Sequence, residues 1–165
     1  MTDETGVINF TVEGRTKGGF LMEKHERILI PLDGSECAET IIPRVEELAT
    51  VKQAGICLLR VVSATTFPGV DPTEAQVKVV REAEEYLQSL KERLRAKGFD
   101  VDTHVRYGDD VEEILDHAAQ KEIDLVAMST HGRNGIKRFL FGSVAEKVLR
   151  HAPKPVYLVR CTGLA

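Results

Sequence analysis

The chain has 165 residues, of which 42% are hydrophobic and 29% are charged, as is usual for one globular domain with its own core. Its formal net charge of −4 argues against a general nucleic-acid-binding protein, because such proteins carry an excess of basic residues. No apolar run approaches the ~20 residues of a membrane span, and the first residues lack the basic and apolar regions of a signal peptide. We therefore expect a cytoplasmic protein that binds neither nucleic acid nor membrane.

The three cysteines are Cys37, Cys57 and Cys161, which are odd in number and far apart. They have no C-x-x-C spacing, so the sequence predicts neither a disulfide framework nor a zinc ribbon. Cys57 lies in an apolar run and is predicted to belong to the core. No histidine or carboxylate spacing is typical of a metal site, and we expect no protein-held metal.

The chain divides into an N-terminal extension, residues 1–25, and one domain, residues 26–165. The extension is rich in glycine and mixed in charge, which favours a flexible leader. Residues 7–12 are of β type, and the alternatives are a short strand or an arm that binds a partner.

The first predicted strand, residues 27–32, is continuously apolar, as is typical of a strand buried on both faces. It ends in Asp33-Gly34-Ser35, a turn followed by a helix N-cap at Ser35. Apolar residues then recur at helical spacing. Pro43 interrupts this pattern, which predicts either a kink or a helix that begins after Ser35.

The alternation of strand and helix continues to the end of the chain, with strands at 56–62, 101–107, 123–128 and 156–159. The intervening helices are predicted to begin near Asp71, Asp110 and Ser143. The strand at 101–107 has a more polar face and is expected at an edge. This alternation predicts a doubly wound α/β fold with one parallel sheet and helices on both faces.

The stretch from Ser129 to Ser143 predicts an anion site. Two glycines, Gly132 and Gly142, bracket a loop that contains Arg133 and other basic residues, and a helix is expected to begin at Ser143. Glycine permits a close backbone approach, and a helix N-terminus attracts phosphate. The Ser143-x-x-Glu146 pattern also predicts a capping box.

Asp33 follows the first strand, so it should lie at the same sheet edge as the Ser129–Ser143 stretch. Its carboxylate either supports the turn or binds a ribose hydroxyl. His131 has no neighbouring nucleophile and is not predicted to be catalytic. The apolar segment 136–141 is unexplained by phosphate binding; it should pack on the body, act as a lid or meet a partner.

Standard nucleotide and hydrolase motifs are absent in their usual form: there is no Walker loop, no G-x-G-x-x-G and no G-x-S-x-G. A receiver domain is also rejected. Lys154 precedes the last strand where that fold needs a lysine after it, and the acidic pair Asp109-Asp110 is not beside Asp33.

Together, the motifs resemble the universal stress protein family over Arg27 to Arg160. The resemblance rests mainly on the pattern Ser129-x2-Gly132-x9-Gly142-Ser143, and Pro31-Leu32-Asp33-Gly34-Ser35 matches the first loop of the family. The resemblance implies a five-stranded sheet of order 3-2-1-4-5, homodimers paired through the last strand, and a site for ATP with Mg²⁺. Ser129 departs from the pattern, because a glycine is usual there.

The resemblance also implies which residues would form the ATP site. Asp33 would hold the ribose, and Mg²⁺ would be held mainly by phosphate oxygens. The adenine and sugar would be lined by Pro31, Leu32, Val61 and Met128. The phosphates would be bound by Gly132, Arg133, Gly142, Ser143 and Val144, next to Ser129.

Three functions are therefore considered. The first is an ATP-binding, dimeric stress-response protein that regulates an unknown partner. The second is a slow ATPase or self-phosphorylating enzyme with Ser143 as the acceptor, although no general base or lysine clamp is visible. The third is a dimerisation module that binds no nucleotide.

Overall fold

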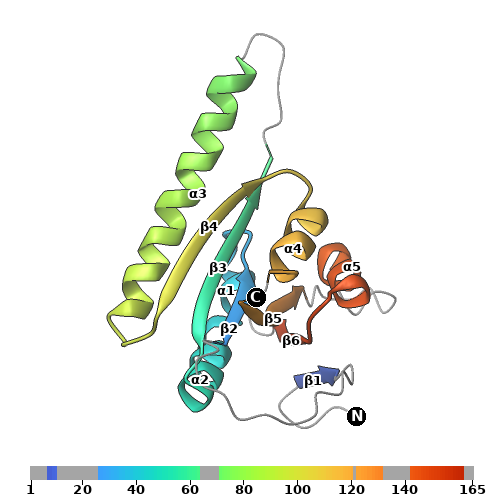
Figure 1. Cartoon of the computed structure of the whole chain (residues 1–165). Helices are drawn as coiled ribbons and strands as arrows, with labels where there is room; N and C mark the ends of the chain where they lie inside the picture. The colour runs from blue at the N-terminus through green and yellow to red at the C-terminus, as the bar shows by residue number, and fades with distance from the viewer. Residues whose placement is uncertain (1–6, 11–25, 64–70, 121, 132–141, 162–165) are drawn as a thin grey trace.

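A computed structural model describes residues 7–10, 26–63, 71–120, 122–131 and 142–161. Its centre is one sheet with the strand order β1-β6-β5-β2-β3-β4 (Figure 1). The parallel strands are β2 (Arg27–Pro31), β3 (Gly55–Val62), β4 (Val101–Tyr107), β5 (Ile123–His131) and β6 (Val156–Cys161). Taken in chain order, these five strands have the order 3-2-1-4-5, which confirms the predicted fold. β4 lies at an edge, as its alternation predicted.

Helices cover both faces of the sheet. They are α1 (Glu36–Glu39), α2 (Ile42–Lys52), α3 (Pro72–Arg95), α4 (Asp110–Ala118) and α5 (Ser143–His151). One core cluster joins α1, α2 and α3 to one face, and a second joins α4 and α5 to the other. In Figure 1 the long α3 runs beside β3 and β4, and α4 and α5 lie on the opposite side.

The conflict at Pro43 is resolved by two helices in place of one. Ser35 caps α1, where its Oγ accepts a hydrogen bond from the Ala38 N–H at 3.0 Å. After a short break the chain enters α2 with Pro43 in the first turn, where a missing N–H costs nothing. The N-cap predicted at Ser35 is confirmed, and the helix that contains Pro43 begins later, at Ile42, as one of the two alternatives predicted.

The N-terminal extension contributes a sixth strand. Residues Val7–Phe10 form β1, which pairs antiparallel with β6 from Val7 opposite Val159 to Phe10 opposite Val156. The outer edge of β6 is thus occupied by the same chain. Of the alternatives for residues 7–12, the short strand forms over these four positions.

Gly34 allows the turn that follows β2. Its φ is +82°, and a Cβ there would collide with the Arg60 guanidinium, which stacks over the Tyr86 ring at 4.9 Å. We expect Gly34→Ala to lower the free energy of unfolding by about 1–2 kcal/mol for the backbone strain. Displacing Arg60 from Tyr86 should add about 0.5–1 kcal/mol.

Gly98→Ala is the matched control, because Gly98 has φ of +93° but nothing within 4 Å of the added methyl group. Urea denaturation should show the smaller loss for Gly98→Ala. In an Arg60→Ala background the two substitutions should become equivalent. Equal losses in the native background would exclude the Arg60 contact as a cause.

Candidate nucleotide site

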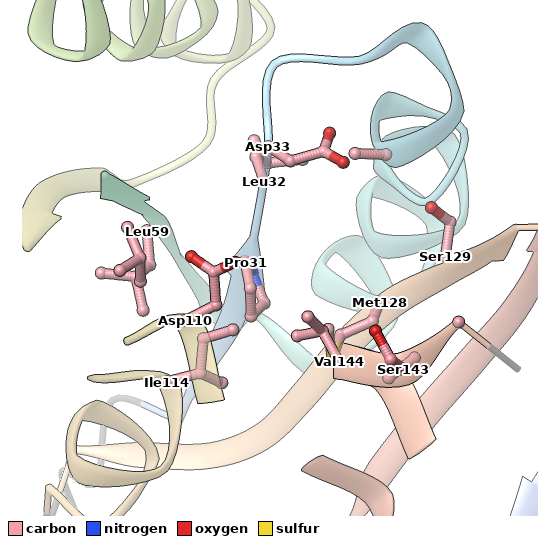
Figure 2. A pocket seen from close by; sticks show the side chains of 14 residues that line it. Pro31, Leu32, Asp33, Leu59, Asp110, Ile114, Met128, Ser129, Ser143 and Val144 are labelled. Atoms are coloured by element: carbon pink, nitrogen blue, oxygen red, sulfur yellow. The ribbon is translucent and has the colours of Figure 1, made fainter. Parts of the chain in front are cut away.

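A cavity of about 240 Å³ lies beyond the carboxyl ends of β2 and β5, bordered by α1, α4 and α5. Figure 2 shows side chains from these elements converging on it. Most of the predicted site residues line it: Pro31, Leu32, Asp33, Val61, Met128, Ser129, Gly142, Ser143 and Val144. Gly132, Arg133 and the segment 136–141 lie outside the described residues.

Asp33 supports the turn at the end of β2. Its Oδ1 accepts a hydrogen bond from the Ser35 N–H at 2.8 Å. Asp110, the first residue of α4, also lines the cavity, and partial burial together with the nearby Asp109 and Asp33 carboxylates raises the pKa of its carboxyl. The cavity thus has an acidic rim next to its apolar walls.

Ser129 has a structural contact that explains a serine at this position. Its Oγ donates a hydrogen bond to the Cys37 carbonyl at 2.7 Å, which ties the end of β5 to α1. A glycine could not make this bond. The departure from the family pattern therefore adds a link between two walls of the cavity without removing a cavity residue.

The capping box predicted at Ser143 is wrong. The N-cap of α5 is Gly142, Ser143 is the first helical residue, and no side chain of the described residues caps this helix. Glycine has no side chain with which to accept from the first-turn N–H groups. Because those N–H groups have no intrahelical partner, they form the kind of anion site described for helix N-termini.

The cysteine spacing predicted no disulfide framework, and the structure nevertheless contains a disulfide. Cys37 in α1 and Cys161 at the end of β6 form a disulfide with a Cα–Cα distance of 5.6 Å and a separation of 124 residues. The bond crosses the carboxyl edge of the sheet beside the cavity. Cys57 is the free cysteine and is buried in the core, as predicted.

Several residues that line the cavity were not predicted from the sequence, namely Ala38, Leu59, Asp110, Ile114 and Ala145. Some signals were available. Leu59 and Val61 alternate on one strand, and Asp110 and Ile114 are four residues apart on one helix, so each pair shares a face. Nothing in the sequence distinguishes Ala38 or Ala145, which line the cavity, from other small residues of the core.

Among the described residues, no helix is long and apolar enough to cross a membrane.

The chain matches the universal stress protein family over residues 24–160. It is 30% identical to a universal stress protein of Methanocaldococcus jannaschii over 141 residues, which is 82% of each chain. The solved structure of MJ0577 has a TM-score of 0.73 at 31% identity, with 86% of this chain and 99% of that chain covered. The Lactobacillus plantarum protein UspA has a TM-score of 0.68 at 27% identity, with 84% and 100% covered.

Two more distant structures of this fold were solved with nucleotides. One universal stress protein was solved in complex with cAMP, at 20% identity and a TM-score of 0.56, with 84% of this chain and 98% of that chain covered. The protein from Archaeoglobus fulgidus was solved in complex with dAMP, at 21% identity and a TM-score of 0.61, with 82% and 98% covered. The family match over residues 24–160, together with the order of the parallel strands, shows that the chain belongs to the universal stress protein family.

Proposed function

We propose that this protein is a nucleotide-binding regulatory protein whose cavity takes ATP with Mg²⁺. The observation that carries the proposal is that one cavity combines apolar walls, the Asp33 carboxylate and the N-terminus of α5, which no described side chain caps. These are the three surfaces that a base, a ribose and a phosphate chain require. The nucleotides in two solved relatives support the same ligand class.

Each part of the nucleotide has a counterpart in the cavity. Pro31, Val61 and Met128 offer apolar surface to the adenine and sugar, and Asp33 accepts from a ribose hydroxyl. The phosphates lie at the N–H groups of Ser143 and Val144, with Gly132 and Arg133 as further phosphate ligands. Mg²⁺ is held mainly by phosphate oxygens, as is usual for this ion.

The nucleotide serves as a regulatory ligand more than as a substrate. The carboxylates that line the cavity are Asp33, whose Oδ1 is bonded to the turn, and Asp110, on the rim. No lysine lines the cavity among the described residues. Because the described part of the cavity supplies no lysine clamp, hydrolysis should be slow. Ser143 is exposed at the cavity, and a self-phosphorylating activity would use its hydroxyl.

Calorimetry on protein stripped of nucleotide tests the proposal. We expect saturable binding of ATP in Mg²⁺. Asp33→Asn should weaken it about tenfold, because a charged acceptor for the ribose is lost. The amide oxygen can still accept from the Ser35 N–H, so the turn is kept. Asp116→Asn is the matched control on the exposed face of α4.

The absence of saturable binding by AMP, ADP and ATP would overturn the proposal. Phosphate incorporation that is lost in Ser143→Ala would instead favour the enzyme. If Asp33→Asn and Asp116→Asn bind ATP equally well, Asp33 has no role in holding the ribose.

We also propose that the protein forms a homodimer through the C-terminal strand, and that formation of this dimer depends on β1. β1 already pairs with β6 along its outer edge. We infer that residues 7–10 and the last strand of a second copy compete for that edge, so that the N-terminal extension regulates assembly.

A further inference from the structure

A cluster of three potential metal ligands lies outside the nucleotide cavity. It consists of Cys57 on β3, His104 on β4 and His117 on α4, whose ligand atoms all lie within 4.8 Å of one another. The Cys57 Sγ is 3.4 Å from the His117 Nε2. The ring centroids of His104 and His117 are 4.7 Å apart, and the two ring planes make an angle of 53°. None of the three residues lines the cavity.

The fold fixes all three residues on the face of the sheet that α4 covers. In the β3–β4 register, Cys57 is opposite Asp102 and Leu59 is opposite His104, so Cys57 and His104 lie on the same face two positions apart. His117 is on the buried side of α4 with Ile114 and Ala118. Because two strands and a helix of one core hold these residues, their arrangement is set by packing.

The cluster is deep at one end and open at the other. Cys57 and His117 are 2% and 1% exposed, whereas His104 is exposed at the edge strand. A metal ion can therefore arrive from the side of His104 and reach two ligands that are shielded from water. A fourth position would remain for water or another ligand.

We propose that Cys57, His104 and His117 form a Zn²⁺ site with one open coordination position. A thiolate with two imidazoles is a ligand set for zinc, and it does not suit Mg²⁺ or Ca²⁺, which require oxygen. Bonds of about 2.3 Å to sulfur and about 2.0–2.1 Å to nitrogen place a tetrahedral sulfur and nitrogen about 3.5–3.6 Å apart. The Cys57 Sγ and the His117 Nε2 are 3.4 Å apart, which is within about 0.2 Å of this separation. The His104 ligand nitrogen lies within 4.8 Å of the other two ligand atoms, and because His104 is exposed its side chain can move closer to them.

Gln120 supplies the second contact that a metal-binding histidine usually has. Its side-chain amide nitrogen lies 3.4 Å from the His117 Nδ1, and a rotation of the amide exchanges the nitrogen with the oxygen. With the amide oxygen turned towards the ring, it accepts from Nδ1–H and leaves Nε2 for the metal. With the amide nitrogen there, Nε2 carries the proton and donates to Cys57. The alternative to a metal site is therefore a buried hydrogen bond between Cys57 and His117, in which His104 has no part.

Burial is the largest influence on the protonation of Cys57 and His117. Burial raises the pKa of the Cys57 thiol to about 12, and nearby Asp102 and Glu122 act in the same direction while Arg27 opposes them. Burial lowers the pKa of His117 to about 4, with His104 and Arg106 adding to this effect and Glu122 opposing it. Because a metal-bound thiolate has lost its proton, metal affinity should fall as the pH is lowered.

Titration with Co²⁺, a spectroscopic probe for zinc sites, tests the proposal on the full chain in a phosphine reductant. We expect equimolar Co²⁺ to give thiolate-to-cobalt charge transfer and the bands of tetrahedral cobalt, both removed by Zn²⁺. His104→Ala should weaken binding by more than about tenfold. His151→Ala, at an exposed histidine of α5, should leave it unchanged.

A Cys37→Ser, Cys161→Ser double variant controls for the other two thiols and should keep the full signal. Cys57→Ser should lose the charge-transfer band, and His104→Ala gives the answer if Cys57→Ser does not fold. The proposal is overturned if the wild type shows no charge transfer, if the double variant loses it, or if His104→Ala binds as the wild type does.

Discussion

Replacing Cys161 by serine is expected to lower the free energy of unfolding by about 2–4 kcal/mol in protein prepared without reductant. The Cys37–Cys161 disulfide joins residues that are 124 positions apart, so breaking it frees most of the chain in the unfolded state. Urea denaturation measures the effect. Wild type should lose the same amount when a reductant is added, and the variant should be insensitive to reductant.

A thiol count provides the control. Alkylation of unfolded, non-reduced wild type should modify Cys57 alone, because the other two cysteines are paired. Modification of all three cysteines, or a wild type whose unfolding is indifferent to reductant, would show that the disulfide does not form in solution.

The disulfide also lies beside the proposed nucleotide site. Ala38, next to Cys37, lines the cavity, and the Cys37 carbonyl accepts the Ser129 hydroxyl. We therefore expect the position of α1, which forms one wall of the proposed binding site, to differ between the oxidised and the reduced pair.

The fold could be predicted because its signals are local. The continuous apolar run at β2 and the alternation at β4 reflect burial on two faces and on one. Ser35, Asp71 and Asp109 cap helices with their own side chains, so a short stretch of sequence is sufficient to locate each helix start. The positions of Asp33 and Ser129 at the carboxyl ends of strands were likewise sufficient to predict that both lie at one cavity.

The features that were missed depend on contacts between distant elements. The Cys37–Cys161 pair, the Cys57–His104–His117 cluster and the Ser129–Cys37 hydrogen bond each join residues from different elements. Their formation depends on strand register and helix rotation, which spacing in one sequence does not reveal. The capping box failed for another reason: the helix begins one residue earlier than its pattern required, so Gly142 is the N-cap.

Deleting residues 1–10 is expected to convert the chain to a homodimer, or to tighten an existing one. In the full chain β1 pairs with β6 from Val156 to Val159, and deletion leaves the outer N–H and C=O groups of β6 without a strand partner. An exposed strand edge pairs readily with another chain, and a two-fold axis allows β6 of two copies to pair with each other. Light scattering after size exclusion, over a range of concentrations, measures the mass.

Single proline substitutions at two adjacent residues of β1 test the same competition in the full chain, without truncation. Ile8 and Asn9 lie opposite Leu158 and Tyr157. In an antiparallel ladder successive N–H groups point to opposite sides, so one of these two residues donates towards β6 and the other away from it. Of Ile8→Pro and Asn9→Pro, one should therefore promote dimerisation much more than the other. A truncated chain that stays monomeric at high concentration would contradict competition for this edge, and so would a full chain with the same dimer affinity as the truncated one.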